Sequence, residues 1–133
     1  IYHFPANLFV ADFIGNPKVN LIEGEIDAQN LVDLGDFNIK ANTYNATGKV
    51  VVGVRPEDIT ITNQSVAGGV ECIVYSVLPS GADSTIVAQR GDLELTIRVI
   101  GISKLKMDEK IWLTFDPETL NLYHKDTGEL ICP

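Results

Sequence analysis

Hydrophobic and polar residues alternate with a period of two along most of this chain. Between residues 93 and 99, leucine, isoleucine and valine occupy every odd position, and polar residues occupy every even position. This is the pattern of a half-buried antiparallel strand. The same pattern, or a short apolar run between turn residues, predicts further strands at 19–26, 49–54, 59–62, 70–78, 85–89, 110–115, 120–124 and 129–131.

Turn-forming residues separate these segments. Examples are Asn45-Ala46-Thr47-Gly48, Arg90-Gly91-Asp92 and Asp126-Thr127-Gly128. Short strands that are interrupted this often are typical of an all-β barrel or sandwich, and no helical pattern lies between them. The sequence therefore predicts an all-β fold and disfavours a parallel α/β sheet.

One short helix is expected near the N-terminus, at residues 5–14. Pro5 suits the first turn, apolar residues follow, and Gly15 with Pro17 ends the helix. The apolar residues cover more than one stripe, so we expect two covered surfaces in the intact protein.

Length and charge limit the possible partners. The chain has 133 residues, which suits one domain or a small domain with an added hairpin, and its formal net charge is -8. The negative field opposes nucleic acid and anionic lipid. No apolar run approaches the roughly 20 residues that span a bilayer. We therefore expect no nucleic-acid partner and no direct membrane insertion.

The sequence contains no nucleotide-binding loop. Such a loop needs Gly-x-x-x-x-Gly-Lys followed by Ser or Thr, whereas Gly48-Lys49 is followed by Val50 and lacks the upstream glycine. We therefore expect no ATP site in this chain.

Catalytic, metal and redox motifs are also not found in the sequence. The only histidines are His3 and His124, and neither is assigned a catalytic role. Cys72 and Cys132 form no Cys-x-x-Cys, and the carboxylates do not recur at ligand spacing. We therefore expect no catalytic residue, no metal and no cofactor, with two thiols in a reducing compartment.

Several short motifs together carry a resemblance to a known family. They are Pro5-Ala6-Asn7-Leu8-Phe9-Val10-Ala11, Phe13-Ile14-Gly15-Asn16-Pro17, Asn20, Gly53-Val54-Arg55-Pro56-Glu57 and Phe115-Asp116-Pro117-Glu118. In this order they resemble the C-terminal regulatory part of the ATPase subunits of bacterial sugar-type ABC importers, the maltose-importer ATPase family. That part is an OB-like TOBE domain, and the likeness covers nearly the whole chain.

The resemblance implies an architecture. We expect an OB-like barrel with an added small sheet or hairpin and one short N-terminal helix. Residues 1–17 would be a linker helix that joins a nucleotide-binding domain, and residues 18–133 the regulatory domain. The start at Ile1, without methionine, fits an excised piece of such a protein.

The resemblance also implies a function, which is non-catalytic regulation and dimerisation within an ATP-binding subunit. ATP and magnesium would bind in the absent domain. The expected partners are that domain, a second copy of the parent and the membrane permease subunits, at the inner face of the cell membrane. The alternative function is a small-ligand module that binds an oxyanion or another solute, with Arg55 or Arg98 as ligand contacts.

We expect the motif residues to be mainly structural. Pro56 should bend the chain at the end of a strand, and Arg55 and Glu57 should bond to the backbone or to each other. One loop departs from the family, because only Gly81 and Asp83 are kept where relatives have an acidic residue, Leu-Gly and a second acid. The residues assigned to motif or structural roles are Phe13, Gly15, Asn20, Gly53, Arg55, Pro56, Glu57, Gly81, Asp116 and Pro117.

Overall fold

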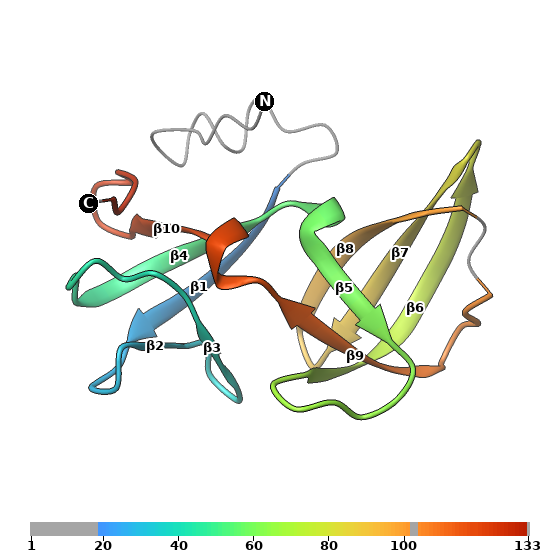
Figure 1. Ribbon diagram of the computed structural model, residues 1–133, viewed down its shortest axis with the longest axis horizontal. Helices are drawn as coiled ribbons and strands as arrows, with labels where there is room; N and C mark the ends of the chain where they lie inside the picture. Colours follow the sequence, from blue (N-terminus) through green and yellow to red (C-terminus); the bar gives the residue numbers. More distant parts are fainter. Residues whose placement is uncertain (1–18, 102–103, 133) are drawn as a thin grey trace. The chain divides into compact units, whose positions relative to one another are not determined.

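The computed structural model describes residues 19–101 and 104–132, and nearly all of its regular structure is β-strand (Figure 1). The chain divides into two compact units. Unit 1 consists of Ile1–Arg55 and Asp116–Pro133, and unit 2 consists of Pro56–Phe115. The predicted all-β fold is confirmed. The expected helix at 5–14 and the linker at 1–17 lie outside the described residues.

Unit 1 contains a five-stranded antiparallel sheet in the order β10-β4-β1-β2-β3. Its strands are β1 (Asn20–Ile26), β2 (Leu31–Asp33), β3 (Asn38–Lys40), β4 (Gly48–Val54) and β10 (Asn121–His124). The β1–β4 pair is the longest and runs from Asn20 opposite Val54 to Ile26 opposite Gly48. Because β4 pairs with β1 on one side and β10 on the other, it is an interior strand of this sheet.

The core of unit 1 is built around β4. Its residues from Val50 to Val54 are all buried, so β4 is covered on both faces. Such a strand must be apolar at successive positions, not only at alternate ones. This explains the continuous run of valines. Neighbouring strands supply the rest of the core, mainly Ile22, Ile26, Val32, Ile39 and Leu122.

Unit 2 contains a second antiparallel sheet, in the order β5-β9-β6-β7-β8. Its strands are β5 (Ile59–Thr62), β6 (Val70–Ser80), β7 (Asp83–Arg90), β8 (Leu93–Ile100) and β9 (Lys110–Phe115). The short 3-10 turn η1 (Pro56–Asp58) precedes β5 and contacts β8 at the other side of the sheet. The sheet is therefore curled around its apolar interior, as Figure 1 shows.

The alternation of apolar and polar residues in the sequence correctly predicts which side chains of β8 face the interior of unit 2. In β8, Leu95 and Ile97 are buried whereas Glu94 is exposed. The other strands add buried residues to the same core, including Val74, Ile86, Ala88, Ile111 and Leu113. The β6–β7 register shifts between Val74 and Ser76, which marks a bulge at Tyr75.

Two strands of unit 1 were not predicted. Each of β2 and β3 has three residues, which is too short for a period of two to be recognised, and they pair with each other across the turn at Gly35. One predicted strand was too long. Within 129–131 the structure has only an isolated bridge, between Leu130 and Tyr123.

Candidate functional site

The Gly-Val-Arg-Pro-Glu motif begins at the end of β4, where a tyrosine ring lies against the backbone. Gly53 pairs with Leu21 of β1 and Asn121 of β10. A Cβ atom at Gly53 would lie 3.2 Å from Cε2 of Tyr123, which is buried. That contact is tighter than ordinary van der Waals contact. A glycine at this position therefore leaves room for the Tyr123 ring.

Asn20 holds the start of β1 to the end of β4. It lies opposite Val54 in the register, and its side-chain Nδ2 donates a hydrogen bond to the Val54 carbonyl oxygen at 3.3 Å. This bond ties the two strands together one residue before Arg55. The geometry thus gives Asn20 a structural role.

Arg55 and Pro56 mark the first crossing of the chain between the two units. Arg55 is the last residue of unit 1 before the crossing and is half-buried, and the buried Pro56 opens η1 in unit 2. The 3-10 turn η1 therefore begins at Pro56, shortly after β4 ends at Val54. Burial raises the pKa of Tyr123 above its ordinary value, and the positive charge of Arg55 partly opposes that rise.

The return crossing is built in a similar way. Asp116 precedes the 3-10 turn η2 (Pro117–Thr119) and caps it, because its Oδ1 accepts a hydrogen bond from the Glu118 backbone N–H at 3.0 Å. The Asp116 carbonyl oxygen accepts from both the N–H and the hydroxyl of Thr119, each at 2.9 Å. Both crossings are therefore followed by a 3-10 turn that a proline starts.

The remaining sequence candidates lie at separate places. Gly81 forms the β6–β7 turn with a φ of 62°, a conformation that favours glycine. Arg98 lies half-buried on β8 opposite Thr85. Ligand contact by Arg55 or Arg98, and the bonds expected between Arg55 and Glu57, stay predictions. Phe13, Gly15 and His3 lie outside the described residues.

Unit 1 contains a charged group that the sequence did not predict. It consists of Glu23 in the middle of β1, Lys49 near the start of β4 and Lys125 just after β10. Lys125 Nζ bonds to Glu23 Oε1, although the two residues are far apart in the sequence. The hydrogen bond and charge of Lys125, with a smaller effect of Lys49, lower the pKa of Glu23 below its ordinary value. A depression of about 510 Å³ beside this group is lined by Thr47, Gly48, Lys49, His124, Lys125 and Asp126.

This depression has mixed charge. Two lysines line it, but Glu23 neutralises Lys125, and Glu25 lies opposite Lys49 in the register. Asp126 adds a further carboxylate. The group therefore has no excess of positive charge with which to hold an anion.

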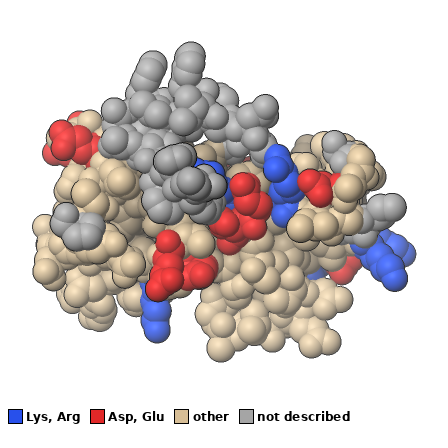
Figure 2. All heavy atoms as spheres, turned by 45° about the horizontal axis from the view of Figure 1, so that its top comes forward, with Lys and Arg blue, Asp and Glu red and all other residues tan. Residues whose placement is uncertain are grey.

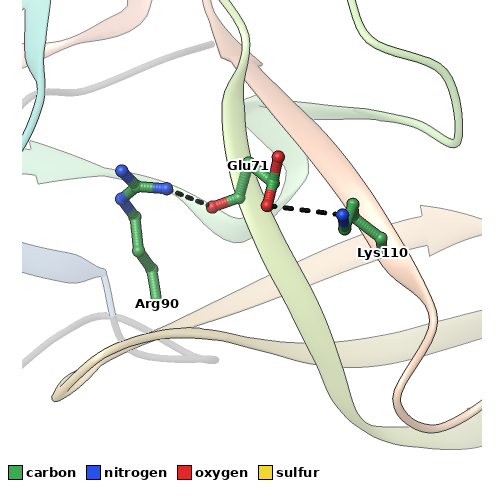
Figure 3. Close-up of polar contacts among 3 residues, drawn as sticks. All are labelled: Glu71, Arg90 and Lys110. Atoms are coloured by element: carbon green, nitrogen blue, oxygen red, sulfur yellow. Dashed lines mark hydrogen bonds and ion pairs between the residues drawn. The ribbon is translucent and has the colours of Figure 1, made fainter.

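Unit 2 has its own polar group at the start of β6. Lys110 Nζ lies 3.8 Å from Glu71 Oε2, and Arg90 Nη1 donates a hydrogen bond to the Glu71 carbonyl oxygen at 2.7 Å (Figure 3). All three residues are at strand ends. The arrangement neutralises the Glu71 carboxylate and fastens the end of β7 to β6, so it is best explained as structural.

The surface gives no sign of a polyanion site on the face drawn in Figure 2, where acidic side chains form several separate groups with lysines and arginines between them. Among residues 19–101 and 104–132, no three histidine, cysteine, aspartate or glutamate side chains gather as metal ligands would. Within the same ranges, no helix has the length and apolar character to cross a bilayer. Both cysteines are thiols, with Cys72 buried and Cys132 exposed.

Two family models match the chain. The model of the MalK OB fold domain matches residues 15–59, and the model of the TOBE domain matches residues 52–122. Together they span the motif at Gly53 and all of unit 2.

Two relatives with similar sequences are import ATP-binding proteins. The sn-glycerol-3-phosphate import ATP-binding protein UgpC of Escherichia coli K12 is 29% identical over 137 aligned residues, and that of Escherichia coli O157:H7 is 30% identical. Each alignment covers 98% of this chain but only 38% of the relative. The chain thus spans well under half the length of these relatives.

A solved structure has a related fold. The cytoplasmic molybdate-binding protein ModG aligns with a TM-score of 0.64, covering 77% of this chain and 94% of that protein. Its sequence identity is 16%, so the likeness concerns the fold and not the ligand.

The contact between Gly53 and Tyr123 gives a stability prediction. Gly53→Ala should destabilise the protein by about 1–3 kcal/mol, because the new methyl group overpacks against the ring. Urea unfolding would measure the change. In a Tyr123→Leu background the same substitution should cost less, because the ring is gone. An equal cost in both backgrounds would show that the ring is not the obstacle.

The Glu23–Lys125 ion pair gives a pH prediction. Since Lys125 lowers the pKa of Glu23 in the folded state, the pair stabilises the protein at neutral pH, and this contribution is lost as the pH falls through that lowered value. Lys125→Met should raise the pKa of Glu23 towards the ordinary glutamate value, as measured by NMR titration of the side chain. Sodium chloride at about 1 M should raise it in the unmodified protein but hardly in the variant. Equal pKa values in both proteins would contradict the pairing.

Proposed function

We infer the function of this chain from the family to which it belongs, the TOBE domain family. The chain is homologous to the C-terminal regulatory region of sugar-type ABC importer ATPases. We propose that it regulates the ATP hydrolysis of such a subunit and contributes to its dimer, without hydrolysing ATP itself.

One observation carries this proposal. The alignment with import ATP-binding proteins covers 98% of this chain but leaves most of each relative unmatched. A P-loop ATPase binds the phosphates of ATP with the string Gly-x-x-x-x-Gly-Lys-Ser/Thr, and the 133 residues contain no such string. The chemistry of the parent would therefore belong to a nucleotide-binding domain that this chain does not include.

The proposed partners follow from the same relation. They are the nucleotide-binding domain of the parent chain, a second copy of the parent, and the membrane permease subunits. The parent would sit at the inner face of the membrane and supply ATP-driven uptake, and the nature of its solute would be decided by other subunits. The UgpC relatives are named for sn-glycerol-3-phosphate import, which makes organic solutes of this kind the class we propose.

The surface of β6 supports a contact between two copies. Ile73 and Leu78 lie on the outer face of the sheet, because they pair with Gln89 and Thr85, which alternate with the inward-facing Ile86 and Ala88 of β7. The bulged Tyr75 lies between them. These three side chains, which we call the β6 stripe, are about half exposed, at 47%, 57% and 53% respectively. Neighbouring exposed apolar side chains are typical of protein interfaces.

The regulatory assignment predicts that the isolated chain does not bind nucleotide. Titration calorimetry with magnesium ATP at up to about 1 mM should give no saturable heat. A dissociation constant of about 1 mM corresponds to a binding free energy of about −4 kcal/mol, so the titration would detect binding of that strength or stronger. In the parent ATPase, deletion of residues 20–132 should leave ATP binding intact but change the rate of hydrolysis. Micromolar ATP binding by the isolated chain, or an unchanged hydrolysis rate after the deletion, would refute the assignment.

The β6 stripe predicts weak self-association. In sedimentation velocity experiments the isolated chain should shift from monomer towards dimer between about 10 µM and 1 mM. Tyr75→Ser combined with Leu78→Ser should abolish the shift, because it removes apolar area from the contact. Tyr44→Ser is the matched control, since Tyr44 is an exposed tyrosine of unit 1. A chain that stays monomeric, or a variant that associates as before, would exclude this contact.

A further inference from the structure

A small pocket in unit 1 has the features of a ligand site. It has a volume of about 220 Å³ and lies between the turn at Tyr44 and the segments on either side of β10. Leu120, Leu122 and Ile131, all buried, provide its apolar lining. The Ile131 backbone N–H donates to the Leu122 carbonyl oxygen at 2.7 Å, which fixes two of these side chains relative to each other. The apolar wall is therefore preformed.

The aromatic residue at the rim is held in an unusual backbone conformation. Tyr44 has a φ of 48° and Asn45 a φ of 62°, so two successive residues other than glycine lie in the left-handed region. For a bulky residue such as tyrosine this conformation is a genuine outlier. The Ala46 N–H closes the turn on the Thr43 carbonyl oxygen at 2.8 Å, and Thr43 is buried. Strain of this kind is typical of ligand-binding segments.

The strained turn places Tyr44 among the residues that line the pocket. Tyr44 lines the pocket, but 48% of its surface is exposed. Packing against the buried core therefore does not explain why the tyrosine lies at this position. A half-exposed tyrosine offers a flat apolar surface together with a hydroxyl group. Such a surface suits a molecule that is apolar on one side and polar at its edges.

The polar groups at the pocket favour an uncharged ligand with hydroxyl groups. Asn42 and Asn121 each supply both donors and acceptors, and Glu118 supplies acceptors. A hydroxyl group donates and accepts, and so can bond to all three. An anion would face the Glu118 carboxylate, and no lysine, arginine or histidine is among the described residues that line the pocket. Phosphate and other oxyanions are therefore disfavoured.

The volume limits the size of the ligand. Pockets for drug-sized molecules are roughly 300–1,000 Å³, and this one is smaller. It suits one sugar ring or a short polyol. We propose that this pocket binds a small neutral sugar or polyol, with Tyr44 against its apolar side and the asparagine amides on its hydroxyl groups. This site is independent of the regulatory role proposed above.

Titration with named probes tests the proposal. Amide spectra of the ¹⁵N-labelled chain would be followed during addition of glucose, maltose and glycerol, with inorganic phosphate and sn-glycerol 3-phosphate as charged counterparts. At least one neutral probe should give saturable shifts at Asn42, Tyr44 and Asn121, with a Kd of about 0.1–10 mM. The charged probes should give none there. Saturation by a charged probe alone, or by no probe at about 100 mM, would overturn the proposal.

Matched variants separate a specific site from general effects. Tyr44→Ala should weaken binding by about 10-fold or more, whereas Met107→Ala, which removes an exposed apolar side chain of unit 2, should not change it. Asn42→Ala is a second test at an exposed position, where the fold should tolerate the change. Glu118→Gln should leave affinity for a neutral probe within about threefold. Retained binding in both Tyr44→Ala and Asn42→Ala would exclude this pocket.

Discussion

Burial of β4 on both faces is the constraint on which the rest of unit 1 depends. A strand in this position has no solvent face, so its side chains must be apolar and its backbone must find partners on both edges, which β1 and β10 provide. Where β10 places the Tyr123 ring against the backbone, a Cβ atom at Gly53 would lie 3.2 Å from the ring, so a larger residue would crowd it. The Arg55-Pro56 pair then ends the strand and takes the chain out of unit 1.

Three motif residues in the described part of the chain have roles in the backbone and its packing. Gly53 admits a ring, Asn20 bonds to the backbone at the end of β4, and Asp116 caps the 3-10 turn at the return crossing. Each role concerns the backbone or the packing of a neighbour. Residues with roles of this kind can therefore carry the likeness to the family.

The sequence predicts those parts of the fold that depend on local pattern. The alternation of apolar and polar residues predicts strand β8 and which of its faces is buried. The turn residues predict the boundaries between most strands. The three-residue strands β2 and β3 depend on pairing across the turn at Gly35, which no local pattern reveals. The same reason explains the pocket at Tyr44. Asn45 belongs to a turn that the sequence predicts, but only the folded backbone shows the left-handed conformation of Tyr44 and the leucines that line the pocket with it.

Net charge determines which surfaces of such a chain can meet a partner. Two copies that each carry a charge of -8 repel one another, but at physiological salt the repulsion is screened beyond about 8 Å. Only charges near the contact then matter. At one end of the β6 stripe, Lys110 offsets the charge of Glu71. An exposed ion pair of this kind adds little stability to the fold. In the self-association proposed above, its effect would be to offset one negative charge beside the apolar contact.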